Sequence, residues 1–439
     1  MFNTIKNAWK IPDLRKKILF TLFIIIVFRF GSIVPVPFLD MSALNELMSY
    51  VDSTNNALSM VNMMTGGAFA QATLFAMGIT PYINSSIIMQ LLTVAIPPLE
   101  RMAREGEEGR KRIGAITRYV TVVLGLIQGA AYFFYLRNNN ITLYNDGAAQ
   151  VFAAIVIILA FTAGTALMMW LGEQINQKGI GNGISILLFA GILARLPSTA
   201  QQLWSYIEMA NSAPETYGKY YALAPLWVVL FLAIIWVIIF MNDAERRIPI
   251  QYAKRVVGRK MYGGQSTHMP IKVGMSGVMP IIFASSILSI PSTIQLFMGS
   301  NVAEGFWAAF FDAFSPTGWL YCILYFILIL AFAYFYMTIQ YNPIEMANNL
   351  RQNNGTIPGV RPGRPTSDYI SKILAKVTMI GALFLAFIAI IPIIYGNISE
   401  LGRLSMGGTS VIIMVGVALD TVKQMESQMM MRHYKGFLD

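Results

Sequence analysis

Long apolar runs separated by polar connections organise this chain. A helix that crosses the bilayer core of about 30 Å needs about 20 apolar residues, and only a helix pairs all its backbone groups within one segment in lipid. The pattern predicts ten such helices, at roughly 18–36, 75–97, 115–136, 151–171, 182–204, 225–241, 275–298, 319–341, 373–395 and 406–422. The first run is too long for a secretory signal and no small-residue cleavage site follows it, so we expect a retained helix.

Lysine and arginine gather in alternate connections. Of the 32 in the chain, 27 lie in the two termini and every second connection, and only four lie in the remaining connections. Arg29 falls within the first run. Because basic residues mark the cytoplasmic side of a membrane protein, both termini are predicted to be cytoplasmic. An even number of helices agrees with this orientation.

Composition supports an integral membrane protein and limits its chemistry. Hydrophobic residues make up 56% of the chain and charged residues 12%, against about 25% charged residues in soluble domains. The single cysteine, Cys322, excludes a disulfide framework and a cysteine metal site. His268 and His433 are the only histidines, and no G-x-x-x-x-G-K-[ST] sequence occurs. We therefore expect no cofactor, no metal and no catalytic residue.

Two other functions compete with a passive channel. Residues 274–277 read Gly-Met-Ser-Gly and match the G-x-S-G sequence of rhomboid-type proteases, but a serine nucleophile needs a base and both histidines fall in cytoplasmic segments. An ion-coupled transporter needs ionisable groups near the membrane midplane. Arg29 lies toward the outer end of its run, and Glu173 and Asp420 lie near cytoplasmic helix ends. Small-residue packing and an interfacial arginine are the favoured interpretations.

Three further segments carry functional hypotheses. Residues 57–74 are mildly apolar but contain two glycines, so we expect an interfacial or re-entrant segment, the kind that also lines substrate paths. Ile79 and Ile83 are four positions apart and share one helix face. The basic connections 242–274 and 342–376 suit anionic lipid or docking to a large anionic partner. Their length favours docking.

Seven sequences, in order along the chain, resemble the SecY family of bacterial protein-translocon channels. They are MGITPYINSSIIMQLL (77–92), EGEEGRKRI (105–113), MWLGEQINQKGIGNGIS (169–185), YAKRVVGRKMYGGQSTHMPIKV (252–273), MPIIFASSIL (279–288), IPGVRPGRPT (357–366) and MGGTSVIIMV (406–415). The resemblance covers nearly the whole chain. It departs at residues 353–356, which are more apolar in the family, and at Leu188, where isoleucine is common and the change conserves volume.

The resemblance implies an all-α polytopic fold of ten transmembrane helices in two inverted halves, 1–200 and 201–439, around a central pore. It implies an aliphatic constriction, which excludes water and ions and deforms around a polypeptide, at Ile79, Ile83, Ile184, Leu188, Ile282 and Ile413. It also implies a plug over about 57–74, represented by Ala57, Met60, Gly66, Gly67, Ala70 and Leu74.

The resemblance further implies a lateral gate between helices 2 and 7, flanked by helices 3 and 8. The polar residues on helices 2 and 7 are Thr80, Ser86, Gln90, Ser285 and Ser286. Hydrogen bonds from them are expected to hold the gate closed at about 0.6–2 kcal/mol each, with ordinary interhelical packing as the alternative.

Partners and location follow from the same resemblance. It implies the membrane subunits SecE and SecG, the SecA ATPase or a ribosome, signal sequences, unfolded precursors and anionic lipid, in a bacterial plasma membrane. The candidate docking residues are Arg246, Arg247, Lys254, Arg255, Arg259, Arg361 and Arg364. Arg255 and Arg361 are the best candidates, and Arg361 lies between Pro358 and Pro365, which stiffen the loop. The expected function is a passive protein-conducting channel driven from outside, without enzymatic activity.

Overall fold

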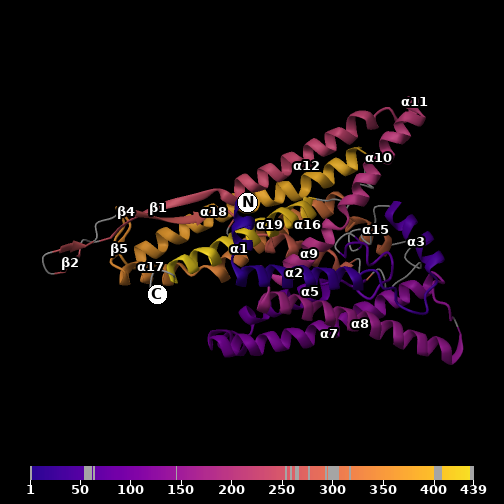
Figure 1. Ribbon diagram of the computed structural model, residues 1–439, viewed down its shortest axis with the longest axis horizontal. Coiled ribbons are helices and arrows are strands. Elements are labelled where there is room, and N and C mark those ends of the chain that lie inside the picture. The colour runs from indigo at the N-terminus through magenta and orange to yellow at the C-terminus, as the bar shows by residue number, and fades with distance from the viewer. Residues whose placement is uncertain are drawn as a thin grey trace.

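The computed structural model describes residues 2–53, 62, 65–144, 146–252, 255–257, 260–262, 266–274, 277–291, 294, 306–315, 318–399 and 408–435. Most helices run along one long axis, with the strands at one end and α3, α11 and α15 toward the other (Figure 1). The elements are α1 (Phe2–Lys10), α2 (Pro12–Gly31), α3 (Met41–Ser53), α5 (Thr80–Ala95), α6 (Pro97–Arg104), α7 (Glu107–Asn138), α8 (Gly147–Lys178), α9 (Gly183–Leu193), α10 (Leu196–Ser212), α11 (Pro214–Tyr217), α12 (Tyr220–Asp243), β1 (Glu245–Tyr252), β2 (Arg255–Val257), β3 (Lys260–Tyr262), β4 (Ser266–Lys272), α13 (Met279–Leu288), α15 (Phe306–Ala313), α16 (Trp319–Gln340), α17 (Pro343–Gln352), β5 (Gly355–Thr356), α18 (Arg364–Ser399) and α19 (Gly408–Lys435).

Each of the ten predicted apolar runs coincides with a helix. In chain order these are α2, α5, α7, α8, α9 with α10, α12, α13, α16, α18 and α19. Within the described ranges, six helices are long and apolar enough to cross a membrane, or seven if α5 and α6 are one span bent by 100°. The remaining three runs are α2, α13 and α19. The ten-helix prediction is therefore consistent with the fold.

Local sequence explains where several helices begin and end. Pro97 and Pro98 stop α5 and start α6, because the residue before a proline is driven out of the helical region, and Ile96 is extended with φ −110° and ψ 111°. The Asn182 side chain accepts hydrogen bonds from the first N–H groups of α9 at 3.1 and 3.4 Å. Asp40 caps α3, and its bonds to Ser42, above all from the hydroxyl, lower the pKa of that carboxyl below its usual value.

The basic connections form a small sheet that the sequence analysis did not predict. β1 pairs antiparallel with β4, from Glu245 opposite Lys272 to Gln251 opposite Ser266, and with β5 on its other edge. Buried Ile248 and Ile250 alternate with exposed residues along β1, which is the period of a half-buried strand. The all-α class therefore describes the spanning part of the molecule, and the polar connections add strands to it.

Buried apolar residues form one large central cluster and smaller satellites. The central cluster draws on α2, α5, α8, α9, α12, α13, α16, α18 and α19, and a second one joins α3, α7, α8 and residues 69–77. Large apolar side chains also point outward, as Phe23, Trp236 and Phe240 do. A water-soluble surface rarely exposes so many, whereas lipid-facing helices do.

Candidate functional site

The residues predicted to form the constriction come from four helices and meet in one buried cluster. Ile79 and Ile83 lie at the start of α5, Ile184 and Leu188 in α9, Ile282 in α13, and Ile413 in α19. All except Ile184 are only 2–3% exposed and belong to the central cluster, and Ile184 packs against that cluster. The fold thus brings together side chains that are up to 334 positions apart, from residue 79 to residue 413.

Tight turns set the start of α5 and α13 at this cluster. Gly78 has φ +56° and Gly277 has φ +57°, a conformation that side-chain-bearing residues rarely adopt. Ile79 caps α5, and the Ile83 amide donates a 3.1 Å hydrogen bond to its carbonyl. The predicted shared face of Ile79 and Ile83 is therefore present. The six predicted residues are all aliphatic and offer no hydrogen-bonding side chains, so they favour no particular substrate side chain.

The predicted plug lies partly within the described residues. Ala57 and Met60 fall outside them, whereas Gly66, Gly67, Ala70 and Leu74 lie in a series of turns between residues 65 and 79. Residues 65–74, the described part of the predicted segment apart from residue 62, form turns and not a helix. We call residues 65–78 the plug segment.

Side-chain hydrogen bonds hold the turns of the plug segment together. The Phe69 amide donates to the Thr65 hydroxyl at 3.2 Å, and the Ala70 amide donates to the Asn62 side chain at 3.0 Å. Ala68 and Phe69 are buried. Ala68 belongs to the same cluster as the aliphatic constriction residues, so the plug segment packs on that cluster.

Three helices fix the plug segment. A Cβ on Gly66 would lie 2.8 Å from the backbone oxygen of Gly191 in α9, and one on Gly164 in α8 would lie 1.8 Å from that of Leu74. From α7, the buried Tyr132 hydroxyl donates a 2.7 Å hydrogen bond to the Phe69 carbonyl. Sequence reasoning missed Tyr132. A tyrosine within an apolar run is a signal for a buried partner, but it does not identify the partner.

The helices predicted to form the lateral gate are in contact. α5 packs on α13, α7 lies beside α5, and α16 lies beside α13. The predicted hydrogen bonds across the gate are not seen among the described residues. Ser285 donates to the carbonyl of Ile282 in its own helix at 3.0 Å, and Gln90 donates to Ser86 within α5 at 3.4 Å.

Two further polar residues complete the predicted gate set. The Ser286 hydroxyl is buried and has no hydrogen-bond partner in the described part of the chain. Thr80 is half-buried at the start of α5. The interhelical bond of α5 comes instead from Ser85, which the sequence analysis passed over. Its hydroxyl donates to the Thr117 carbonyl of α7 at 2.7 Å.

The two basic connections join into one unit, the basic platform, made of β1, β4, β5, α17 and the first turns of α18. β5 pairs with β1, and beneath the sheet a small apolar cluster includes Ile248, Ile271 and Ile370. Arg246 and Arg247 are exposed on β1.

The remaining docking candidates are placed unevenly. Arg361 and Arg364 are exposed before and at the start of α18. Arg255 lies in β2, and only its backbone is described; Lys254 and Arg259 lie outside the described residues.

Hydrogen bonding and special backbone angles fix the loop that carries Arg361. The Thr366 hydroxyl donates to the Arg361 carbonyl at 2.8 Å, and the flanking Gly359 and Gly363 have φ +80° and +102°. The loop is therefore ordered by glycine turns as well as by the predicted prolines. Upstream, Asn354 has φ +53°, a conformation that asparagine tolerates better than most residues. The residues at 353–356, which differ from those usual in the family, therefore suit this turn.

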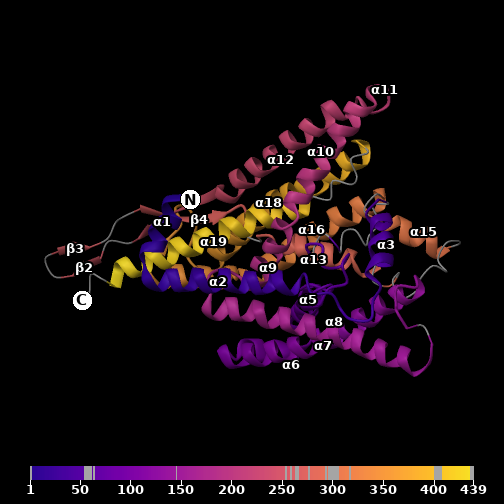
Figure 2. The same ribbon diagram turned by 45° about the vertical axis from the view of Figure 1, so that its right-hand side comes forward.

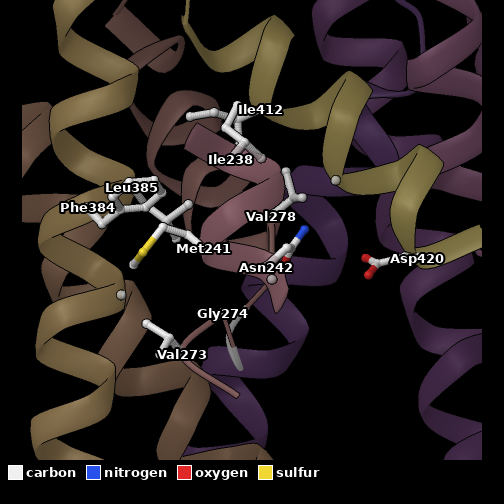
Figure 3. Close-up of a pocket in the computed structure, with 13 residues that line it drawn as sticks. Ile238, Met241, Asn242, Val273, Gly274, Val278, Phe384, Leu385, Ile412 and Asp420 are labelled. Carbon is white, nitrogen blue, oxygen red and sulfur yellow. The ribbon is translucent and has the colours of Figure 1, made fainter. Parts of the chain in front are cut away.

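The start of α13 lies over a narrow pocket between α12, α18 and α19 (Figure 3). Apolar side chains line most of it, with Asn242 and Asp420 as polar lining residues. A Cβ on Gly416 of α19 would lie 2.4 Å from the Val278 side chain, so α13 enters the bundle in close contact with α19.

The residues of the two competing functions are only partly described. Ser276 lies outside the described residues, and His268 is exposed on β4. Arg29 is half-buried, and one of its terminal nitrogens is buried without a partner among the described residues. Among all the described residues, no group of three or more His, Cys, Asp and Glu side chains is placed to hold a metal ion.

Comparisons with known proteins agree with this architecture. The family model described as SecY matches residues 73–422. The protein translocase subunit SecY of Halalkalibacterium halodurans is 44% identical over 441 residues, and that of Bacillus subtilis is 43% identical over 442 residues. Each alignment covers 100% of both chains.

Solved structures share the fold at low sequence identity. A SecY structure, described as one whose plug domain stabilises the closed state of the translocation channel, has a TM-score of 0.64 at 17% identity and covers 94% of this chain and 92% of its own. Sec61 in a canine ribosome–channel complex has a TM-score of 0.57 at 15% identity and the same coverage. The family match and the full-length relatives show that this chain belongs to the SecY family.

Proposed function

We propose that this chain is the pore-forming subunit of a protein translocase. It passes unfolded secretory polypeptides across the membrane and releases apolar segments sideways into lipid. One observation carries the proposal: four helices of a SecY-family fold bring the aliphatic side chains of Ile83, Leu188, Ile282 and Ile413 into one buried hydrophobic cluster. Such a cluster seals against ions by excluding water and accepts side chains of any sequence.

The plug segment and the gate helices complete the channel. The plug segment packs on the aliphatic cluster through Ala68, which is where a closed channel needs a stopper. α5 belongs to the half 1–200 and α13 to the half 201–439, and the two helices are in contact. Separating the halves at this contact opens a path to lipid. Both termini are cytoplasmic, in a bacterial plasma membrane. The charge asymmetry supports this, and so do the positions of α1 and of the C-terminal end of α19, which lie toward the strands (Figure 2).

A cysteine crosslink from a stalled precursor tests the function. Cys322 is replaced by serine, and a single cysteine is placed at Ile83 or Ile282, with Ile157 in the α7–α8 core as the matched buried control. We expect crosslinks at residues 83 and 282 that require precursor, SecA and ATP, and none at 157. Absence of a crosslink at both ring positions in folded, SecA-bound protein would contradict the pore assignment.

The basic platform is the docking site for an external motor, SecA or a ribosome, and SecE and SecG are the membrane partners. Sec61, which shares this fold, is seen in a complex with a ribosome, and this supports the ribosome as a partner. Exposed guanidinium groups on an ordered loop suit bidentate contacts with carboxylates or phosphates. Arg361→Glu is expected to abolish SecA-driven export while the protein still inserts.

A matched substitution separates docking from total charge. Arg110→Glu changes the charge equally at an exposed position on α7 and should leave export nearly intact. Normal export by the Arg361 variant would remove this residue from the docking site. Ser276→Ala is expected to leave transport unchanged, and loss of proteolysis of a membrane substrate in that variant would instead favour the protease.

A further inference from the structure

The N-terminal helix α1 packs on the body of the protein through Ala8. It contacts α2 and α19. Ala8 is fully buried in a small cluster with Leu14, Ile180 and Met425, which come from α2, the α8–α9 connection and α19. This inner side fixes α1 to the body of the molecule beside the first predicted membrane helix.

The other side of α1 combines lysines with an aromatic residue. Lys6 and Lys10 are exposed and four positions apart, so they lie on the same side of the helix. Trp9 is 45% exposed beside them. In the sequence, Phe2 and Ile5 precede Trp9 by seven and four positions, the spacing of one apolar helix face. The sequence of α1 is therefore amphipathic, and among the described residues Lys6, Trp9 and Lys10 make no side-chain hydrogen bond, ion pair or ring contact.

Positive charge continues beyond α1. Arg15 and Lys16 are exposed in the first turns of α2. Asp13 is the single acidic residue in the sequence before Asp40. Any partner of this surface must therefore accept a strong local excess of positive charge.

The position of α1 points to a lipid surface. The apolar run of α2 begins at Ile18, so the end of α2 that adjoins α1 lies where lipid headgroups begin. α1 turns across the direction of α2 instead of continuing it (Figure 2). Exposed tryptophan with lysine on such a helix is typical of helices that lie in the membrane interface. Topology alone requires the charges but not a folded helix with an exposed Trp9.

We propose that α1 lies in the headgroup layer and binds anionic phospholipid, with Lys6 and Lys10 on headgroup phosphates and Trp9 at the acyl boundary. This proposal rests on the orientation of α2 and not on channel activity. A failure of the precursor crosslink would leave it standing.

An environment-sensitive fluorophore tests the proposal in the full-length chain. Cys322 is replaced by serine, Trp9→Cys carries a bimane label, and the protein is reconstituted in nanodiscs of phosphatidylcholine with or without phosphatidylglycerol. We expect the label to move into an apolar environment at a low fraction of phosphatidylglycerol. Lys6→Gln with Lys10→Gln should raise the half-saturating fraction by about 25-fold, at roughly fivefold per lysine.

Matched variants separate a lipid site from bulk charge. Lys111→Gln with Lys178→Gln removes the same charge at exposed positions on α7 and α8 and should change nothing. Lys6→Arg with Lys10→Arg should preserve binding. A label that stays in water in every lipid, or that responds equally to phosphatidylcholine alone, overturns the proposal. So does displacement by inorganic phosphate or soluble RNA, which would identify a site for anions in solution.

Discussion

α5 makes contacts of two different kinds with its neighbours. Toward α7, the buried Ser85 hydroxyl donates a 2.7 Å hydrogen bond to the Thr117 carbonyl. α13 also contacts α5, but among the described residues its two buried serines make no hydrogen bond to α5: Ser285 bonds within α13, and the Ser286 hydroxyl has no partner. The contact between α5 and α7 is fixed by a hydrogen bond, whereas the contact between α5 and α13 depends on packing.

The difference decides which contact can open. In lipid, no hydrophobic force holds two apolar helices together, and a polar group that loses its partner stays unsatisfied. Separating α5 from α7 would break the Ser85 bond, whereas separating α5 from α13 breaks no hydrogen bond of the predicted gate residues. We therefore expect α5 to move with α7 and to part from α13.

The largest effect is expected from a polar group placed in the aliphatic cluster. Ile282→Asn exchanges a buried aliphatic side chain of α13 for an amide without a partner, which lowers the free energy of unfolding by about 3 kcal/mol and weakens the closed contact. Ion conductance of reconstituted protein should rise, and precursors with defective signal sequences should be exported. Ile413→Asn should act in the same way.

A second asparagine distinguishes a broken seal from simple instability. Ile157 is fully buried in the α7–α8 core, away from the constriction. Ile157→Asn should destabilise the protein comparably without raising conductance. Equal leaks in both variants would show that the aliphatic cluster has no special place in the seal.

The plug segment extends the comparison, because a single side-chain bond from α7 joins it to that helix. Tyr132→Phe removes the bond to the Phe69 carbonyl and keeps the ring contact, whose centroids lie 4.4 Å apart. We expect a loss of about 1.5 kcal/mol in stability and a smaller rise in conductance than for Ile282→Asn. Tyr135→Phe is the control, since Tyr135 lies beside Tyr132 in the same helix. Identical conductance of both variants would contradict a plug held by Tyr132.

Apolar runs alone located each described helix that is long and apolar enough to span a membrane, because helix length in a bilayer is set by thickness and every run must satisfy it. The sheet was missed for the opposite reason. Ile248 and Ile250 alternate in a polar connection, but their burial depends on Ile271 and Ile370, which lie elsewhere in the chain. Strand pairing of this kind depends on tertiary contacts, and the basic residues of the connection indicate its charge but not its strands.

At the candidate site, residue types were more predictable than partners. The aliphatic set could be predicted from the family because five of its six positions lie within a recognisable sequence and Leu188 lies three residues after one. Ser85 and Ser86 are neighbours of the same type, and only the orientation of α5 against α7 decides that Ser85 is the one bonded across helices. Tyr132 and Phe69 pair over 63 positions, with no local pattern to indicate it.

Ser85→Ala tests the pinned contact at a smaller scale. The expected loss is about 1 kcal/mol, in the range of hydrogen bonds between membrane helices. Because α7 then follows α5 less closely, a labelled pair on these helices should show a broader distance distribution by electron paramagnetic resonance. Ser86→Ala, one position along, should leave both the stability and that distribution unchanged. A similar loss in both variants would remove the distinction between the two serines.

The smallest effect should have the opposite sign. Ser286 lies one turn after Ile282 on α13, and its buried hydroxyl lacks a partner, so the closed state carries the cost of desolvating that hydroxyl. Ser286→Ala should therefore raise stability by about 0.5 kcal/mol and slow the export of precursors with weak signal sequences, while strong ones are unaffected. Ser285→Ala is the control, because Ser285 already bonds to the Ile282 carbonyl. If Ser286→Ala instead lowers stability, the hydroxyl has a partner when the channel is closed, and the contact between α5 and α13 does not rest on packing alone.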